Sequence, residues 1–451
     1  MTSAPTSRPT TNIPVAIPAG APSGAPGTGT GPRTIAGSIP GARSIASRLL
    51  HGTPGRMRLY MALGVVAAIV LGAVSANALL SSQAAVERAA NNTAQVVRAQ
   101  SIHVDLLRAD AVATNAFLIG GLETPESRAR YEDAMARVAT GIAEAAAAQP
   151  ADGAALGALS QQVQTYAALV EQARTNNRLG LPVGAQYLTQ ASAGLRADAI
   201  PIITAVVAAN DQRARDEFDR SNSSLQLAAG LLALIGLVAI AVWLAKRTHR
   251  YLNGRLTGAI ALLLVALVFT LVQVAGVGSA TRAVADGDFG QTVTLAEATT
   301  SANDARANES LTLIRRGSGA ANEKSWKADD QAVRAALADV SDSDSDLETL
   351  TSQWSDYAAV HQQVRELDDN GQWDKAVAMS TDPSAKGSDG TFTTFDTAVT
   401  QARDSAGKDA VARLGELART APIAAIGVAL AALLAAWLVV RGIGQRIEEY
   451  R

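Results

Sequence analysis

Four apolar stretches without any charged residue constrain this chain more than any other feature of its sequence. Each is 20 to 24 residues long and contains no Asp, Glu, Lys, Arg or His. A helix of that length, rising 1.5 Å per residue, covers the roughly 30 Å hydrocarbon core of a bilayer. The sequence therefore predicts an all-α membrane protein with transmembrane helices at residues 59–80, 225–245, 257–280 and 421–440.

The first apolar stretch has one alternative interpretation, a cleaved signal peptide. Ala76-Asn77-Ala78 has the small-x-small pattern of a cleavage site. However, 58 residues precede the stretch, and its apolar run exceeds the 7 to 15 residues of a signal peptide. We therefore expect it to be a retained transmembrane helix.

Charge is distributed unevenly along the chain. The N-terminal tail 1–58, the connector 246–256 and the C-terminal segment 441–451 together carry a net charge of +11. The long segments 81–224 and 281–420 carry −3 and −10, so the whole-chain value of −2 conceals a strong asymmetry. The positive-inside rule places both termini and the connector in the cytosol and the two long segments outside. This topology predicts a multi-pass protein of the cell (plasma) membrane.

The predicted cytosolic parts are too small for a catalytic domain. They comprise 80 residues in three pieces, so we expect no enzyme activity. The tail 1–58 holds nine of the 15 prolines and nine glycines, a composition that predicts disorder. Its 14 Ser/Thr residues permit phosphorylation, although we favour the simpler interpretation of a solvated tail near anionic lipid.

The sequence of the first external segment, 81–224, predicts an antiparallel four-helix bundle. One seam follows a 4-3 spacing from Val86 to Leu118 and ends at Gly120-Gly121, as packed helices require. No Pro or Gly lies between residues 73 and 119, so the first span and this helix should form one continuous rod. Further helices are expected at 125–148, from Pro150 to a turn at 176–180, and from Gly184 into the second span, with a kink or break at Pro201.

The second external segment, 281–420, repeats the plan of the first. Residues 108–131 align without gaps with residues 303–326. In this alignment Leu118-Ile119 matches Leu313-Ile314 and Tyr131 matches Trp326, and a later turn, Asp369-Asn370-Gly371, resembles that at 176–180. We interpret the chain as a duplicated unit of span, bundle and span, with two external four-helix bundles in tandem.

Small residues in two spans suit close helix packing. Ala68, Gly72 and Ala76 share one face of the first span, and Gly427, Ala431 and Ala435 share one face of the fourth. Such small-x-x-x-small faces pack against another span of the chain or against a second copy, which makes a homo-oligomer one expected arrangement.

No catalytic, cofactor-binding or metal-ligating constellation is recognisable. The chain has no cysteine. Asp342-x-Asp344-x-Asp346 resembles the start of a calcium loop but lacks the Gly and Glu of its sixth and twelfth positions, so we interpret it as a solvated turn. No phosphate loop and no basic patch with interleaved aromatics is present, so neither nucleotide nor nucleic acid is expected. No two histidines stand at ligand or triad spacing: His51, His103, His249 and His361.

Polar residues in the bundle seams are the candidates for sensing, although no ligand-binding residue can be assigned. Buried polar residues more often fix helix register, which is the interpretation we favour; a ligand that needs oriented hydrogen bonds is the alternative. The seam residues are Thr93, Gln100 and Thr114 in the first bundle and Thr300, Asn303 and Ser310 in the second.

Several stretches resemble known bacterial sensors. The run HVDLLRADAVATNAFLIGG (103–121) followed by Tyr131 resembles their four-helix-bundle input domains. The four-span duplication, KRTHRYLN (246–253) and NDARANESLTLIRRGSG (303–319) resemble the GlnX-type membrane sensors of actinobacteria, over about residues 53–451. The resemblance implies coupling of an external solute-binding lipoprotein for acidic amino acids and glutamine to the cytosolic serine/threonine protein kinase G. It supplies no site residues.

The resulting hypothesis is a non-enzymatic signal transducer between an external protein partner and a cytosolic kinase. Two alternatives remain: a receptor that binds a small ligand directly within a bundle, and a structural or assembly protein of the cell envelope. Heat of amino-acid binding to the external part would indicate the first alternative. Cross-links to envelope proteins but to no kinase would indicate the second.

Overall fold

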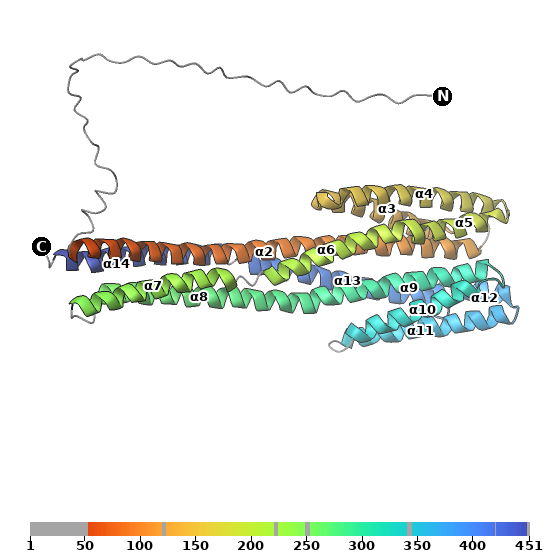
Figure 1. Ribbon diagram of the computed structural model, residues 1–451. Coiled ribbons are helices and arrows are strands. Elements are labelled where there is room, and N and C mark those ends of the chain that lie inside the picture. The colour runs from red at the N-terminus through yellow and green to blue at the C-terminus, as the bar shows by residue number, and fades with distance from the viewer. Residues whose placement is uncertain are drawn as a thin grey trace, which may run out of the picture. The chain divides into compact units, whose positions relative to one another are not determined.

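The computed structural model describes residues 53–119, 123–220, 224–248, 253–340, 345–419 and 421–448. All regular elements in these ranges are helices, and none of the described residues belongs to a strand (Figure 1). The chain divides into two units, residues 1–55 and 56–451, and the second contains every helix discussed below apart from the first residues of α2. Residues 1–52 of the predicted N-terminal tail, Gly120-Gly121 and the acidic stretch 342–344 lie outside the described residues. Residues 53–58, which were predicted to belong to the disordered tail, are part of helix α2.

The first described helix, α2 (Thr53–Ile119), is continuous over 67 residues. It contains both the first predicted span and the first predicted external helix. This continuous helix confirms the prediction of one uninterrupted rod. Its physical cause is that no Pro or Gly interrupts the hydrogen-bond ladder between residues 73 and 119. At 1.5 Å per residue, α2 is about 100 Å long.

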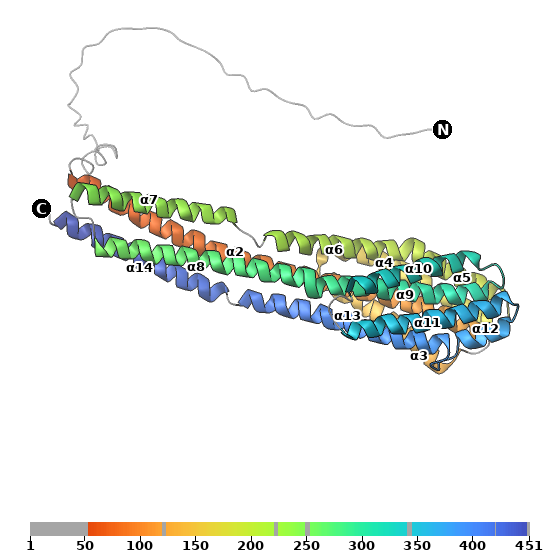
Figure 2. The ribbon, with the colours of Figure 1, turned by 90° about the horizontal axis from the view of Figure 1, so that it is seen from below.

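Among the described residues, five helical stretches are long and apolar enough to cross a membrane. Three of them contain predicted spans, a fourth, Ala228–Lys246, overlaps the predicted span 225–245, and the fifth, Val183–Phe218, lies within the predicted first external bundle. The number of spans therefore stays a prediction. The start of α2, the end of α7 (Ser224–Thr248), the start of α8 (Gly254–Val284) and the end of α14 (Ala421–Glu448) lie at the same end of this unit in both views (Figures 1 and 2).

The predicted spans pack closely against one another. Their buried residues form one apolar cluster that runs from Met57 to Ile443. A Cβ atom added at Gly72 would lie 2.2 Å from the Cβ atom of Ala432, so α2 and α14 approach at a point that only glycine permits. Near the end of the cluster, the Asn253 amide caps α8 and donates to the Gly442 carbonyl oxygen at 2.8 Å.

Three shorter helical segments complete the first bundle around the outer half of α2. As predicted, α3 (Pro125–Ala148) begins with Pro at its first turn, and the Thr124 side chain accepts a hydrogen bond from the Ser127 amide. A short 3-10 turn, η1 (Pro150–Asp152), leads into α4 (Gly153–Arg178). The return path consists of α5 (Val183–Gly194), the π-helical turn η2 (Leu195–Ala199) and α6 (Ile200–Arg220).

Pro201 does not break the returning helix, contrary to one of the two outcomes we expected. The chain passes through α5, η2 and α6 without interruption, and the π-helical turn ends two residues before Pro201. Proline lacks the amide hydrogen that an α-helix needs, and a π turn rearranges the ladder at that point.

The second set of helices resembles the first in its turns. Helices α2 and α9 end at Ile119 and Ile314, the positions that the sequence alignment matches. Gly180 and Gly371 both adopt positive φ, +67° and +75°, in equivalent turns. The elements of this set are η3 (Ala285–Phe289), α9 (Gly290–Ile314), α10 (Ala320–Val340), α11 (Ser345–Asp369), α12 (Trp373–Ser380) and α13 (Ser388–Arg419).

The first helical set, which is the first bundle of α2 to α6, and the second set each have their own apolar core. The two sets also contact each other. One core joins α2 to α3, α4, α5 and α6, and another joins α9 to α10, α11 and α13. Near the predicted spans the sets share a third cluster, in which the Phe218 and Phe289 rings meet edge to face at 6.0 Å. At the far end, Leu118 packs with Leu313. Because residues 56–451 form one compact unit, the arrangement as two tandem domains stays a prediction.

Candidate functional site

A cleft of about 810 Å³ lies between the two helical sets. Side chains from α2, α3, α9 and α13 line it. Its volume falls within the roughly 300–1,000 Å³ of small-molecule sites. The lining carries both signs of charge: Arg108, Arg130, Asp133, Arg137, Arg306, Asp389, Asp396, Asp404 and Lys408.

Arg108 on α2 connects the two sets at this cleft. Its Nε and Nη2 atoms donate to the Asp396 carboxylate on α13, both at 3.0 Å, and Nη2 also donates to Thr400 at 2.8 Å. A fourth hydrogen bond, from Nη1, reaches Asp105 on its own helix at 3.0 Å. Burial disfavours the charged guanidinium, but the two carboxylates prevail and raise the pKa of Arg108. The contact is therefore a fixed ion pair between the two sets.

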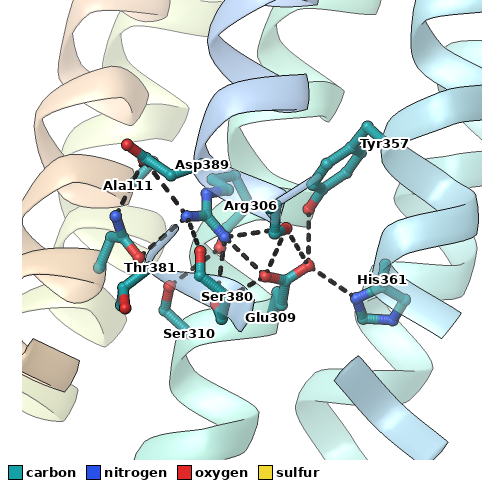
Figure 3. A network of polar contacts seen from close by, with 12 residues as sticks. Ala111, Arg306, Glu309, Ser310, Tyr357, His361, Ser380, Thr381 and Asp389 are labelled. Carbon is teal, nitrogen blue, oxygen red and sulfur yellow. Dashed lines mark hydrogen bonds and ion pairs between the residues drawn. The ribbon is translucent and has the colours of Figure 1, made fainter. Parts of the chain in front are cut away.

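Arg306 on α9 lies at the base of the cleft and is almost fully buried, at 2% exposure. Figure 3 shows its guanidinium between Asp389 and Glu309. It donates to Glu309 at 2.6 Å, to the Asn115 side chain of α2 at 2.9 Å and to the Ser380 carbonyl oxygen at 2.8 Å. Because a buried cation is costly unless it is paired, these contacts fix α2 and α12 to α9.

Glu309 accepts hydrogen bonds from several side chains that surround it. Ser388 donates to it at 2.8 Å. Tyr357 donates at 3.2 Å, and the His361 ring lies 2.9 Å away (Figure 3). Burial disfavours the carboxylate, but Arg306 and His361 outweigh it and lower the pKa of Glu309 to about 2. Glu309 is therefore a charged, fully hydrogen-bonded group.

His361 completes the cluster on α11. Its Nδ1 atom lies 2.9 Å from Glu309 and its Nε2 atom 3.3 Å from Glu323 on α10. The ring stacks on Trp326 at 3.6 Å. Burial favours the neutral ring, but the hydrogen bonds to the two glutamates prevail and raise the pKa of His361. The His361 ring thus joins three helices of the second set, α9, α10 and α11.

A third polar contact between the sets involves Arg196 in η2. It donates to Asp110 on α2 at 2.7 Å and to Asp304 on α9 at 2.6 Å. Asp110 is fully buried and also accepts from Ser192 at 2.6 Å. Burial, opposed by Arg196, raises the pKa of Asp304. Burial and the nearby Asp304 raise the pKa of Asp329 on α10 to about 6.

These contacts hold helices in a defined relative position and leave an open cleft beside them. The carboxylates at the base are held by cations and hydroxyl groups, an arrangement suited to fixing structure and to recognising a charged ligand. Within the described ranges, no group of three or more His, Asp or Glu side chains is arranged to hold a metal ion.

The six seam residues singled out from the sequence are dispersed. Only Asn303 lines the cleft, where its amide donates to Asp396 at 3.1 Å. The hydroxyl groups of Thr114, Thr300 and Ser310 donate to carbonyl oxygens of their own helices. Thr93 Oγ1 and Gln100 Oε1 are buried and make no hydrogen bond with any described residue.

Sequence reasoning missed the buried polar cluster of Arg306, Glu309 and His361, of which Arg306 lines the cleft. Arg306 and Glu309 stand three positions apart on a helix whose neighbours are small, which is a detectable signal of a buried ion pair. The sequence spacing of His361 was tested only for a metal site and a catalytic triad. Its partners, Glu309 and Glu323, are 52 and 38 residues away in sequence, so no local spacing reveals them.

Comparison with known proteins gives one family match. Residues 85–219 match the family described as Actinobacterial sensor domain. The match covers the outer part of α2 and continues through α3, α4 and α5 to α6, which is the first bundle. No curated protein and no solved structure matches the chain. The first bundle thus has the sequence character of a sensor domain.

Proposed function

We propose that this protein is a multi-pass membrane sensor that relays external amino-acid status, as a measure of nitrogen and carbon supply, to a cytosolic serine/threonine protein kinase. An external solute-binding lipoprotein delivers the signal by docking on the bundles. The sensor-domain match over residues 85–219 supports the sensing role. The GlnX-type resemblance of the sequence is the basis for the lipoprotein and the kinase.

The continuity of α2 is the observation that carries the proposal. One helix connects the first predicted span to the far end of the external bundle without a break. Its outer half contacts both helical sets, through Arg108 to Asp396 and through Asp110 to Arg196. A displacement of either set therefore acts on a rigid element that enters the membrane.

Close packing of the spans provides the next step of the relay. At Gly72 the α2 backbone approaches α14 so closely that a movement of α2 must displace Ala432. The end of α14 is connected in turn to the start of α8 through Asn253. A partner shifts this assembly only if it binds one arrangement of the bundles better than another.

The experiment that tests the relay compares cells with and without the protein. Phosphorylation of the kinase's targets is measured before and after external glutamate or glutamine is added. We expect a response in wild-type cells and none in the deletion strain. An unchanged response after deletion refutes the proposal.

Direct binding of a small ligand is a second candidate function, favoured by the volume of the cleft. Calorimetry on the full chain in nanodiscs, with aspartate, glutamate and glutamine, separates the two. Heat of binding without any added protein supports direct sensing. Its absence, together with a response in cells, supports delivery by a partner. Cross-links only to envelope proteins, with no kinase response, support a structural or assembly role.

A further inference from the structure

Four large apolar side chains are exposed at the far end of the first bundle. Leu179, Leu181 and Val183 lie in and beside the turn between α4 and α5, with exposures of 68%, 46% and 38%. Ile119, at the end of α2, is 44% exposed. The Asn177 amide donates to the Phe117 carbonyl oxygen at 3.5 Å, which places the α4–α5 turn beside the end of α2. We call these four residues the apolar tip.

With the four spans as predicted, lipid does not cover the apolar tip. Among the described residues, all other exposed large hydrophobic side chains lie within the four predicted spans, where a bilayer covers them. Ile119 is 39 residues beyond the end of the first predicted span, which corresponds to about 60 Å along a continuous helix. Both views show the α4–α5 turn at the opposite end from the start of α2 (Figures 1 and 2). The tip therefore lies in the aqueous phase.

The duplicated turn in the second set shows that such exposure is not a requirement of the turn itself. There, Trp373 follows the positive-φ Gly371 and folds back onto α9, where its Nε1 atom donates to the Leu313 carbonyl oxygen at 2.9 Å. The Arg316 guanidinium lies over the Trp373 ring, with its Cζ atom 3.9 Å from the ring centroid. The second set thus covers its own apolar residue, whereas the first leaves its leucines uncovered.

We propose that the apolar tip is the docking surface for an external protein that presents apolar side chains beside a carboxylate. The proposal rests on the proposed function, in which a protein delivers the signal. Arg178, next to Leu179, is exposed and forms no ion pair with any described residue, so it is available to a carboxylate of the partner. Exposed apolar patches rimmed by charge mark protein interaction sites.

The size of the tip favours a transient partner over a second copy of this chain. A standard interface takes about 20–30 residues per side, and obligate dimers bury more. In a protein interface a few central side chains contribute most of the binding free energy, and the four apolar side chains of the tip are a set of that size. Both helices that meet at the tip lead to one ion-pair network, since α2 carries Asp110 and α5 continues into η2, where Arg196 pairs with Asp110 and also with Asp304 of the second set. A protein bound at the tip therefore contacts two segments that Arg196 connects to the second set.

The test uses the absence of cysteine from the chain. Val183→Cys is labelled in intact cells with a membrane-impermeant benzophenone maleimide and irradiated, alone and combined with Leu179→Ser and Leu181→Ser. The matched control combines it with Asn370→Ser and Gln372→Ser, two exposed positions of the equivalent turn. We expect a one-to-one adduct with another protein, reduced at least about tenfold by the leucine changes and unchanged in the control.

Two further readouts make the outcome decisive. Thermal unfolding of each purified full-length variant must match the wild type, as exposed positions predict. The kinase response to external amino acids should be lost in the leucine variant and retained in the control. An adduct of two copies of this chain, no adduct, or an adduct insensitive to the leucine changes refutes docking at the tip. A kinase response retained in the leucine variant refutes only the tip, whereas no response in wild-type cells refutes the relay.

Discussion

Replacing Arg306 with methionine should destabilise the protein strongly, because it leaves a carboxylate buried without its main partner. The Arg306 and Glu309 side chains are 2% and 1% exposed and pair at 2.6 Å. Removing one member of a buried pair costs about 3–5 kcal/mol. Since Glu309 keeps His361 at 2.9 Å, we expect the lower value, about 3 kcal/mol at pH 7. For domains of 150–250 residues this corresponds to a fall in Tm of about 6–12 °C.

The assay is thermal unfolding of the full chain in detergent at pH 7. The control is the same substitution at Arg334, whose pair with Asp330 lies on the surface with the arginine side chain 45% exposed. Exposed pairs of this kind contribute at most about 1 kcal/mol. Arg334→Met should therefore unfold close to the wild-type temperature.

The dependence on pH identifies the cause of the loss. The folded-state pKa of Glu309, about 2, is below its ordinary value of 4.5, so the carboxylate contributes stability above pH 4.5 that is lost as the pH falls toward 2. Without Arg306 the pKa of Glu309 rises, and protonation then relieves the buried charge. The destabilisation by Arg306→Met should therefore be smaller at pH 4 than at pH 7. Equal losses at both pH values, or a loss as small as that of the control, would refute the reasoning.

Three further predictions concern the contacts between helices. The raised pKa of Asp329, about 6, means that the folded state binds a proton more tightly than the unfolded chain, so stability should rise as the pH falls from 6 toward 4. Asp329→Asn should remove this rise in a series of Tm measurements, and an unaltered series would contradict the assignment. Gly72→Leu should lower the Tm, because its Cβ atom would lie 2.2 Å from that of Ala432, and Ala432→Gly should restore part of the loss; a Tm equal to wild type would contradict the close approach. Arg108→Met removes the paired hydrogen bonds to Asp396, so amide hydrogen exchange should accelerate in α13 near that residue, and unchanged exchange would show that the contact does not hold the two sets together.

Local features of the sequence predicted the helical elements well. The absence of Pro and Gly between residues 73 and 119 gave the correct continuity of α2. Thr124-Pro125 gave the start of α3, because a capping side chain and a proline act within one turn. The matched Leu-Ile helix ends and glycine turns of the two sets also appear in the structure. Pro201 was harder to judge, because a π turn can accommodate the missing amide hydrogen.

The candidate site was much less predictable. Arg306 and its hydrogen-bond partner Asn115 are 191 positions apart in the sequence, and Arg108 and its partner Asp396 are 288 positions apart. Helical periodicity indicates which face of a helix is buried, but it does not indicate which helix covers that face. The apolar tip was missed for the opposite reason, since Leu179 and Leu181 have the same composition as core residues and only their exposure distinguishes them.

The sequence by itself determined the class of the protein: long, charge-free helices that suit a bilayer and polar helical segments between them. Hydrophobicity and helix propensity are properties of consecutive residues, so a linear reading is sufficient for both. Only the tertiary structure decided that the two helical sets meet side by side, with Arg108, Arg196 and Arg306 bridging them. Burial and pairing of charge depend on which segments come together in space, and the relay proposed for this protein depends on those pairings.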